Sequence, residues 1–238
     1  MELQEFTRMI QNGFNELDLL SDDQINQLYG YMNYVLEKNK VMNLTSITDP
    51  KEFVTKHIID SLTAAVYVKD SHSIIDIGTG AGFPGIPLKI LYPDKELAFM
   101  DSVLKKIDFI RECAQQMGMT KNIYIHQRAE DAGQNPEYRG VFDCGIARAV
   151  AYLPVLLEYC LPLIKKGGIF VAMKGGDIDE ELTACENALS VLQSSIIEKK
   201  QFVLPMTEFS RSILVFRVNG TIPNKYPRKA GLPTKKPL

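Results

Sequence analysis

A carboxylate followed by three alternating glycines has the clearest chemical content in this sequence. Asp76 comes two residues before Gly78, and Gly80 and Gly82 follow at alternate positions. Glycine adopts positive φ angles and lets a backbone approach a ligand without an intervening Cβ. Asp76 stands in a run of isoleucines, where an unpaired carboxylate is costly, so it should have a partner. The pattern predicts a loop that cradles a ligand beside an acid able to meet a cationic group.

Two classes of cofactor fit this loop. The run from Gly80 to Gly85 matches G-x-G-x-x-G, the dinucleotide fingerprint, and Asp101 lies 19 residues after Gly82. The longer pattern from Asp76 to Gly82 resembles the first motif of class I S-adenosylmethionine (SAM) methyltransferases, in which the acid and loop face the amino-acid end of the cofactor. An ammonium group is attracted to a carboxylate, whereas a pyrophosphate needs N–H donors and is repelled by one. The charges therefore favour SAM over a nicotinamide dinucleotide; a plain turn without a ligand is the third possibility.

The loop connects a predicted strand to a predicted helix. Ile74, Ile75 and Ile77 are typical of a strand buried on both faces, and Pro84 suits the first turn of a helix. From residue 73 onward strand and helix patterns alternate, which indicates a parallel sheet with helices on both faces. Further strands are expected at 97–100, 123–125, 141–146 and 168–173, helices at 84–92, 104–117, 152–163 and 178–192, and a last hairpin at 195–204 and 212–218. This terminal antiparallel pair favours an α/β class I methyltransferase fold, Rossmann-like and with seven mainly parallel strands.

Three regions are expected within one structural domain. Residues 1–70 are predicted to form a helical extension, because Ser21–Gln24 and Asp49–Glu52 are helix-start patterns that precede apolar stripes. Residues 71–220 are the predicted SAM-binding core. Residues 221–238 form a basic tail that is rich in proline and expected to be extended.

Composition excludes several other classes of protein. The 238 residues are 45% hydrophobic and 24% charged, as in an ordinary globular protein. There is no uncharged apolar run of about 18 residues, which argues against a membrane span, and the acidic start is unlike a signal peptide. Four well-separated cysteines without a C-x-x-C pair predict reduced core thiols instead of a zinc site or disulfides. We expect a cytoplasmic monomer without a metal.

Acidic residues follow two of the predicted strands, at the edge of the sheet where ligands bind. Asp101 ends the second strand, where its carboxylate can accept both ribose hydroxyls; with Ser102 it can instead cap the next helix. Ala129 and Glu130 follow the third strand, where a backbone N–H and a carboxylate or carbonyl would read adenine; a surface role for Glu130 is the alternative. Phe83 is expected to contact the cofactor through its backbone or to cover it.

The segment after the fourth strand bears on the acceptor. Residues 142–149 have neither an Asn/Asp-Pro-Pro-aromatic motif nor a Pro-Cys nucleophile, and Cys144 lies inside the strand as a core residue. Such a site suits an acceptor that is nucleophilic without losing a proton, for example guanine N7, which needs in-line placement in a dry pocket. Arg148 would orient the base or phosphate or hold the carboxylate of SAM; an ion pair with Asp143 is the alternative. His57 is expected to be a hydrogen-bonded packing residue on the inner face of a helix, and contact with the substrate is the alternative.

Together these stretches resemble the RsmG family (glucose-inhibited division protein B), which methylates N7 of guanine in small-subunit ribosomal RNA. The resemblance covers nearly the whole chain. The matching segments are Asn43–Ile47, His57–Leu62, Asp76–Pro87, Arg128–Glu130, Ala147–Ala149, Lys174–Gly175 and Tyr226–Arg228. The resemblance implies a SAM-dependent enzyme that acts on 16S rRNA in the bacterial cytoplasm. It also implies cofactor contacts at Gly78, Phe83, Ala129, Glu130 and Arg148.

Basic residues provide a hypothesis for RNA binding. The basic residues that could lie on one rim of the site and contact RNA phosphates are Lys174, Arg211, Lys225, Arg228 and Lys229. Tyr226 would stack on a base. The net charge of −2 is too low for strong binding to bare RNA, so the expected substrate is a structured RNA–protein particle, the small ribosomal subunit. Two alternatives stay open. One is a nicotinamide-dependent oxidoreductase, although no Tyr-x-x-x-Lys pair is evident; the other is a non-enzymatic RNA-binding assembly factor.

Overall fold

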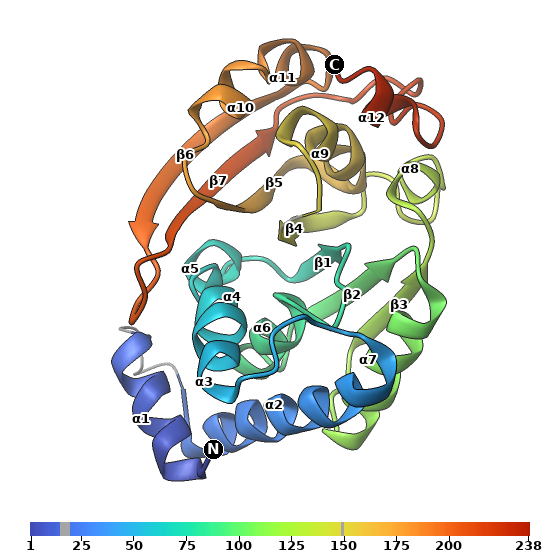
Figure 1. Ribbon diagram of the computed structural model, residues 1–238. Helices are drawn as coiled ribbons and strands as arrows, with labels where there is room; N and C mark the ends of the chain where they lie inside the picture. Colours follow the sequence, from blue (N-terminus) through green and yellow to red (C-terminus); the bar gives the residue numbers. More distant parts are fainter. Residues whose placement is uncertain (15–19, 149) are drawn as a thin grey trace.

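A seven-stranded sheet forms the centre of the computed structural model, which describes residues 1–14, 20–148 and 150–238 (Figure 1). Its order is β3-β2-β1-β4-β5-β7-β6. The strands are β1 (Ser73–Ile77), β2 (Glu96–Asp101), β3 (Asn122–His126), β4 (Phe142–Arg148), β5 (Ile164–Gly175), β6 (Ser194–Val203) and β7 (Ser210–Val218). The first five strands pair in parallel, and β7 is antiparallel to both β5 and β6. The predicted α/β fold with a mainly parallel sheet and a terminal antiparallel pair is confirmed.

Helices cover both faces of this sheet. On one face lie α1 (Leu3–Gly13), α2 (Asp22–Met42), α3 (Pro50–Phe53), the π-helix η2 (Val54–Ile59), α4 (Asp60–Leu62), α5 (Ala65–Val68), α6 (Gly85–Leu91) and α7 (Leu104–Gln116). The other face has α8 (Ala129–Ala132), α9 (Leu153–Cys160), the 3-10 helix η3 (Leu161–Leu163), α10 (Asp179–Thr183), α11 (Glu186–Val191) and the chain end with α12 (Leu232–Lys235). Alternation along β1 explains the two layers: Ile74 packs with the first group, and Ile75 and Ile77 pack with the second.

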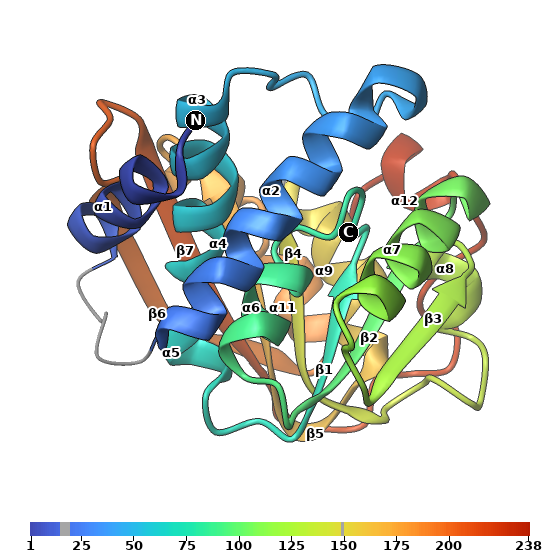
Figure 2. The same ribbon diagram turned by 90° about the horizontal axis from the view of Figure 1, so that it is seen from below.

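The N-terminal helices share the core of the sheet. Helix α2 runs across one face (Figure 2), and its buried residues belong to the same apolar cluster as Ile74. Its start is the expected capping box, in which Ser21 Oγ and the Gln24 side chain each accept a backbone N–H of the other residue. Tyr31 of α2 is fully buried and donates its hydroxyl to the Ala81 carbonyl at 2.7 Å. The N-terminal extension therefore supports the glycine loop directly.

Several segments differ from the sequence-based expectation. The helix expected at 178–192 is divided into α10 and α11. Strand β4 continues to Arg148, because Ala147 and Arg148 pair with Ala172 and Met173 of β5. The tail, expected to be extended, contains the short helix α12 and folds back against α8 and α9. Ala149, the last residue of the Ala-Arg-Ala motif, lies outside the described residues. Within the described ranges, no helix has the length and apolar character needed to cross a membrane.

Candidate active site

The glycine loop turns between β1 and α6 in the conformation that glycine favours. Gly78, Gly80 and Gly82 have φ angles of +72°, +60° and +101°, which side chains with a Cβ rarely adopt. A Cβ built on Gly80 would have no protein atom nearer than 4.0 Å. A Cβ on Gly82 would lie 2.9 Å from the Tyr31 hydroxyl. The space above Gly80 is thus open to a ligand, whereas Gly82 packs inward on the N-terminal helices.

Asp76 lies beneath this loop and is fully buried. Its Oδ2 accepts hydrogen bonds from Thr79 Oγ1 at 2.7 Å and from the Gly85 N–H at 2.9 Å. Its Oδ1 is buried and has no hydrogen-bond partner among the described residues. Burial raises the pKa of Asp76 to about 6, although the bonds from Thr79 and Gly85 oppose that shift. Asp76 does not line the cavities described below, so it positions the loop from underneath instead of forming the cavity wall.

The start of helix α6 is closed to phosphate. Gly85 N–H is bound by the Asp76 carboxylate, and Ile86 N–H donates to the Gly82 carbonyl at 2.7 Å. Pro84 and Pro87 have no N–H to offer. A pyrophosphate at a helix N-terminus needs free N–H donors and no nearby anion, so this helix start does not fit the dinucleotide arrangement.

Two cavities meet beside the loop, and both are lined by Gly78 and Arg148. The first has a volume of about 470 Å³ and the second about 380 Å³. Among the residues expected to bind the cofactor, the first cavity has Gly78, Gly80, Phe83 and Arg148, and the second has Gly78, Asp101, Ser102, Ala129, Glu130 and Arg148. The structure thus brings these residues to one continuous edge of the sheet, while Asp76 and Gly82 support them from below.

Asp101 lies between the glycine loop and α7, and it is not the helix cap considered from the sequence, since the N-cap of α7 is Val103. It lines the second cavity, and its Oδ2 accepts the Gly80 N–H at 3.0 Å. Its Oδ1 accepts the Val103 N–H at 2.9 Å, immediately before α7. Glu130, at the start of α8, is almost buried and accepts the Gly231 N–H at 3.2 Å. Both carboxylates are therefore held rigidly at the wall of this cavity.

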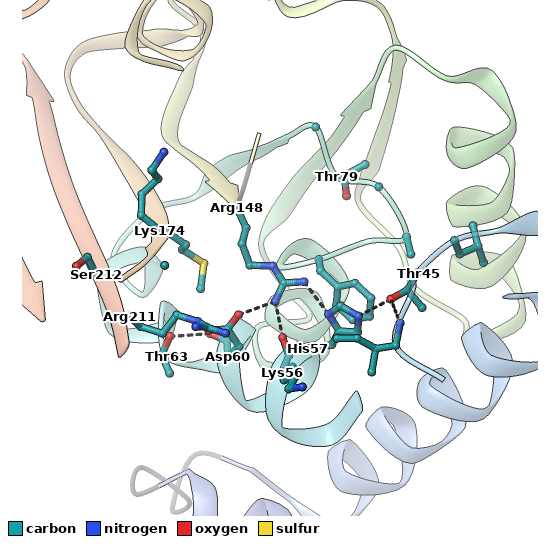
Figure 3. A pocket seen from close by; sticks show the side chains of 18 of the residues that line it. Thr45, Lys56, His57, Asp60, Thr63, Thr79, Arg148, Lys174, Arg211 and Ser212 are labelled. Atoms are coloured by element: carbon teal, nitrogen blue, oxygen red, sulfur yellow. Dashed lines mark hydrogen bonds and ion pairs between the residues drawn. The ribbon is translucent and has the colours of Figure 1, made fainter. Parts of the chain in front are cut away.

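Arg148 is fixed in the first cavity by the N-terminal helices (Figure 3). Its Nη1 donates to Asp60 Oδ2 at 2.9 Å and to the Lys56 carbonyl at 3.2 Å. Asp60 also accepts Arg211 Nε at 2.9 Å, so one buried carboxylate holds two guanidinium groups. The alternative ion pair between Arg148 and Asp143 is wrong, since Asp143 pairs with Lys165 and accepts backbone N–H groups of residues 72 and 73.

His57 completes this cluster as a neutral imidazole. Arg148 Nη2 lies 3.0 Å from His57 Nδ1, and arginine can only donate, so Nδ1 is the acceptor. His57 Nε2 then carries the proton and donates it to Thr45 Oγ1 at 2.8 Å. Burial, assisted by the charge of Arg148, lowers the pKa of His57 to about 3. The ring also stacks on Phe83, with centroids 4.3 Å apart and planes at 10°.

The hydrogen-bonded position expected for His57 is confirmed, whereas Thr45 and Asp60 were not expected at this site. The spacing of three residues between His57 and Asp60 puts both on one side of a helix, which was the available signal. Their shared partner, Arg148, could not be inferred because it lies 88 residues beyond Asp60.

The residues expected to bind RNA do not share one rim. Lys174 and Arg211 line the first cavity, where Lys174 also pairs with Glu181 at 2.8 Å. Lys225, Arg228 and Lys229 line a separate hollow beside α8. The stacking role for Tyr226 is wrong because its side chain is 7% exposed. The phosphate role for Arg228 is also wrong, because Glu158 holds its guanidinium. No group of three or more potential metal ligands occurs within the described part of the chain.

The strand order and the loop after β1 define the fold of a class I methyltransferase. Solved structures with this fold include the O-methyltransferase TomG from Streptomyces achromogenes in complex with SAM, at a TM-score of 0.57 and 17% identity, covering 92% of this chain and all of that one. The O-methyltransferase from Bacillus cereus in complex with SAH has a TM-score of 0.56 and 16% identity, over 91% of this chain and all of that one.

The family follows from the sequence itself. The family model GidB, rRNA small subunit methyltransferase G, matches residues 24–210. Ribosomal RNA small subunit methyltransferase G of Halalkalibacterium halodurans is 45% identical over the full length of both chains. The protein of the same name from Alkaliphilus metalliredigens is 42% identical over 98% of this chain and 99% of that protein. The chain belongs to the GidB family of small-subunit rRNA methyltransferases, and the resemblance predicted from its motifs is confirmed.

Proposed function

We propose that this chain transfers a methyl group from SAM to N7 of a guanine in 16S rRNA. It acts as a monomer on the small ribosomal subunit in the bacterial cytoplasm. Membership of the GidB family and the names of its relatives support the methyltransferase activity and the rRNA substrate. The restriction to one guanine nitrogen, the assembled subunit as substrate and the monomeric state are our inferences.

The observation that carries the choice of cofactor is the carboxylate of Asp76 at the start of α6. It occupies the Gly85 N–H that a pyrophosphate would require, and it leaves one buried oxygen, Oδ1, without a partner beneath the open loop. A ligand with a cationic amino-acid group fits this environment, and an anionic diphosphate does not. The two cavities on either side of Gly78 then suit a ligand with an amino-acid half and a nucleoside half.

The lining residues can be assigned to these halves. We assign Asp101 to the ribose hydroxyls and Ala129 and Glu130 to the adenine edge, because all three line the second cavity. The open space at Gly80 would accommodate the part of the ligand that joins the two halves. Arg148 lines both cavities and offers a cation to the carboxylate of the ligand. When bound, SAM supplies an electrophilic methyl group on a sulfonium centre.

The first cavity is organised to position an acceptor instead of deprotonating it. The Nδ1 lone pair of His57 is already engaged by Arg148, and Asp60 is already shared by two guanidinium groups. Both groups are therefore poor general bases in this arrangement. Leu44, Ile47 and Met173 provide apolar wall. Guanine N7 has a lone pair in its neutral form, so placement in this partly apolar cavity is sufficient.

Transfer of a radioactive methyl group tests the proposal. The purified chain is incubated with methyl-labelled SAM and with small ribosomal subunits, protein-free 16S rRNA or large ribosomal subunits. We expect rapid labelling of the small subunit, slow labelling of bare 16S rRNA and none of the large subunit. Binding to the small subunit without label would support the assembly factor. Tight binding of NADH and none of SAM in calorimetry would support the oxidoreductase.

A further inference from the structure

The C-terminal tail is bound to residues 133–139, which follow α8. The Arg139 guanidinium donates to the carbonyl of Gly133 at 2.6 Å and to those of Ile222 and Tyr226 in the tail at 3.0 and 2.7 Å. Gln134 Nε2 donates to the Pro227 carbonyl at 2.7 Å. Side chains therefore satisfy the tail carbonyls, which lie in no strand. The tail has a defined docked position.

A buried ion pair anchors this tail on α9. Glu158 is fully buried, and its Oε1 accepts both the backbone N–H and Nε of Arg228 at 2.8 Å. Its Oε2 accepts Arg228 Nη2 at 2.6 Å, and the same nitrogen donates to the Lys236 carbonyl at 2.8 Å. The hydrogen bond to Glu158 raises the pKa of Arg228. A buried carboxylate without its partner is strongly unfavourable, so Glu158 holds the tail at Arg228.

Beyond this anchor the tail contacts two residues that line the second cavity. The Gly231 N–H donates to Glu130 Oε1 at 3.2 Å, and Thr234 Oγ1 lies 3.0 Å from the Tyr159 hydroxyl. Both Glu130 and Tyr159 line the cavity that also contains Asp101. Tyr159 is adjacent in sequence to Glu158, so the anchor and the cavity wall lie on one turn of α9.

We propose that the docked tail is part of the cofactor site: by way of Arg228 and Glu158 it positions Glu130 and Tyr159 against the adenosine half of SAM. Arg228 is a positioning residue, since it acts through these two side chains and does not line the cavity. This role rests on the proposed function, which puts the nucleoside half in that cavity. It replaces the RNA contact expected for Arg228 and Tyr226.

The proposal requires that tail docking and cofactor binding favour each other. If the docked tail strengthens SAM binding by some factor, bound SAM must stabilise the docked tail by the same factor. Loss of the anchor should therefore lower the affinity for every ligand that contains adenosine, whether or not the ligand also contains the methionine half. A tail with a purely structural role would lower the melting temperature and leave the affinity of the folded protein unchanged.

The test uses Arg228→Gln in the full chain, with Lys229→Gln as the matched control. Lys229 is the next residue, is exposed and loses the same charge. Calorimetry measures the Kd of SAM and of 5′-methylthioadenosine at a temperature well below the melting point of each variant. From the energy of a hydrogen bond to a charged group, Arg228→Gln should weaken both ligands by a similar factor of about 10. Lys229→Gln should bind both ligands within about twofold of the wild type, since it removes only an exposed charge.

Thr234→Val gives a milder variant in case Arg228→Gln does not fold. It removes the hydrogen bond between Thr234 and Tyr159 and should weaken the binding of both ligands by about threefold. In the unmodified chain, hydrogen exchange of the peptide 228–236 should slow when SAM is added.

The outcomes test the tail proposal and the proposed function separately. A folded Arg228→Gln variant that binds both ligands as tightly as the wild type overturns the tail proposal and leaves the proposed function standing. A variant with a lower affinity for SAM and an unchanged affinity for 5′-methylthioadenosine also overturns it. The same holds if SAM does not slow hydrogen exchange of the peptide 228–236. A wild-type chain that binds no SAM refutes the proposed function and the tail proposal together.

Discussion

The imidazole of His57 should control methyl transfer through the position of Arg148. In the structure it accepts a hydrogen bond from the Arg148 guanidinium, stacks on Phe83 and donates to Thr45. His57→Leu removes the acceptor and leaves Arg148 with its bonds to Asp60 and a backbone carbonyl. His57→Asn keeps an acceptor, because the asparagine oxygen lies near the position of Nδ1.

The size of the effect follows from the contacts that are lost. A hydrogen bond to a charged group contributes about 1.5–3 kcal/mol, and a stacked aromatic pair adds about 0.5–1.5 kcal/mol. Arg148 retains two other acceptors, so we expect about 2 kcal/mol of transition-state stabilisation to be lost in His57→Leu, a decrease of roughly 30-fold in kcat/KM. His57→Asn should recover most of the part that depends on Arg148.

The assay is initial-rate methylation of small ribosomal subunits with labelled SAM. His72 provides a control, since its side chain is exposed and lies at the opposite end of β1 from the glycine loop. His72→Leu should keep the wild-type kcat/KM. The reasoning is refuted if His57→Leu is folded and stays within about twofold of the wild type, or if the leucine and asparagine variants are equally impaired.

Three further predictions concern the loop, the pH dependence and the ribose contact. Gly80→Ala and Gly118→Ala both put a Cβ at positive φ where no protein atom is closer than 4 Å, so each should lose about 1 kcal/mol of stability. Only Gly80→Ala should lower the affinity for SAM, by a factor of about ten or more, which corresponds to about 1.4 kcal/mol. Equal affinities of the two variants in calorimetry would contradict this prediction. The pKa of His57 is lowered to about 3 in the folded protein. Below pH 6.5 the imidazole is therefore protonated in the unfolded chain but not in the folded one, so the free energy of unfolding decreases as the pH falls. The raised pKa of Asp76 acts in the opposite direction between pH 4 and 6. Urea unfolding at pH 6 and pH 5 measures the free energy of unfolding of His57→Asn and of the wild type. Between these two pH values the variant should become more stable relative to the wild type by about 1 kcal/mol. If the difference between the two proteins is the same at both pH values, His57 is not buried in its neutral form. Asp101→Asn keeps an oxygen for the loop N–H and removes the charge, so it should weaken SAM and 5′-methylthioadenosine alike in calorimetry, and a selective loss of SAM would assign Asp101 to the methionine half.

The local elements of the site could be predicted from sequence because their signals are local. The isoleucine run, the alternating glycines and Pro84 fixed β1, the loop and the start of α6 within a few residues. The acids after β2 and β3 followed from the rule that ligands bind at the carboxyl ends of parallel strands. The structure places Asp101 and Glu130 at that edge.

Contacts between distant segments could not be predicted in this way. The pair of Arg228 with Glu158 joins residues 70 positions apart, and nothing in the charge pattern of the tail distinguishes a buried arginine from an exposed one. Tyr226 was assigned to RNA for the same reason, since an aromatic residue among lysines is typical of either setting. A direct contact between Asp76 and the cofactor stays a prediction, because Thr79 and Gly85 engage only Oδ2 and Oδ1 has no partner among the described residues.

The most direct measurement maps the transferred methyl group on 16S rRNA by mass spectrometry. Small subunits from cells without this enzyme are treated with the chain and with SAM that carries a deuterated methyl group, and the rRNA is digested and sequenced. We predict a single labelled guanosine whose modification is on the base, carries a positive charge and is located at N7 by fragmentation. Label on a ribose, on an exocyclic amine or on no nucleotide at all would contradict the account.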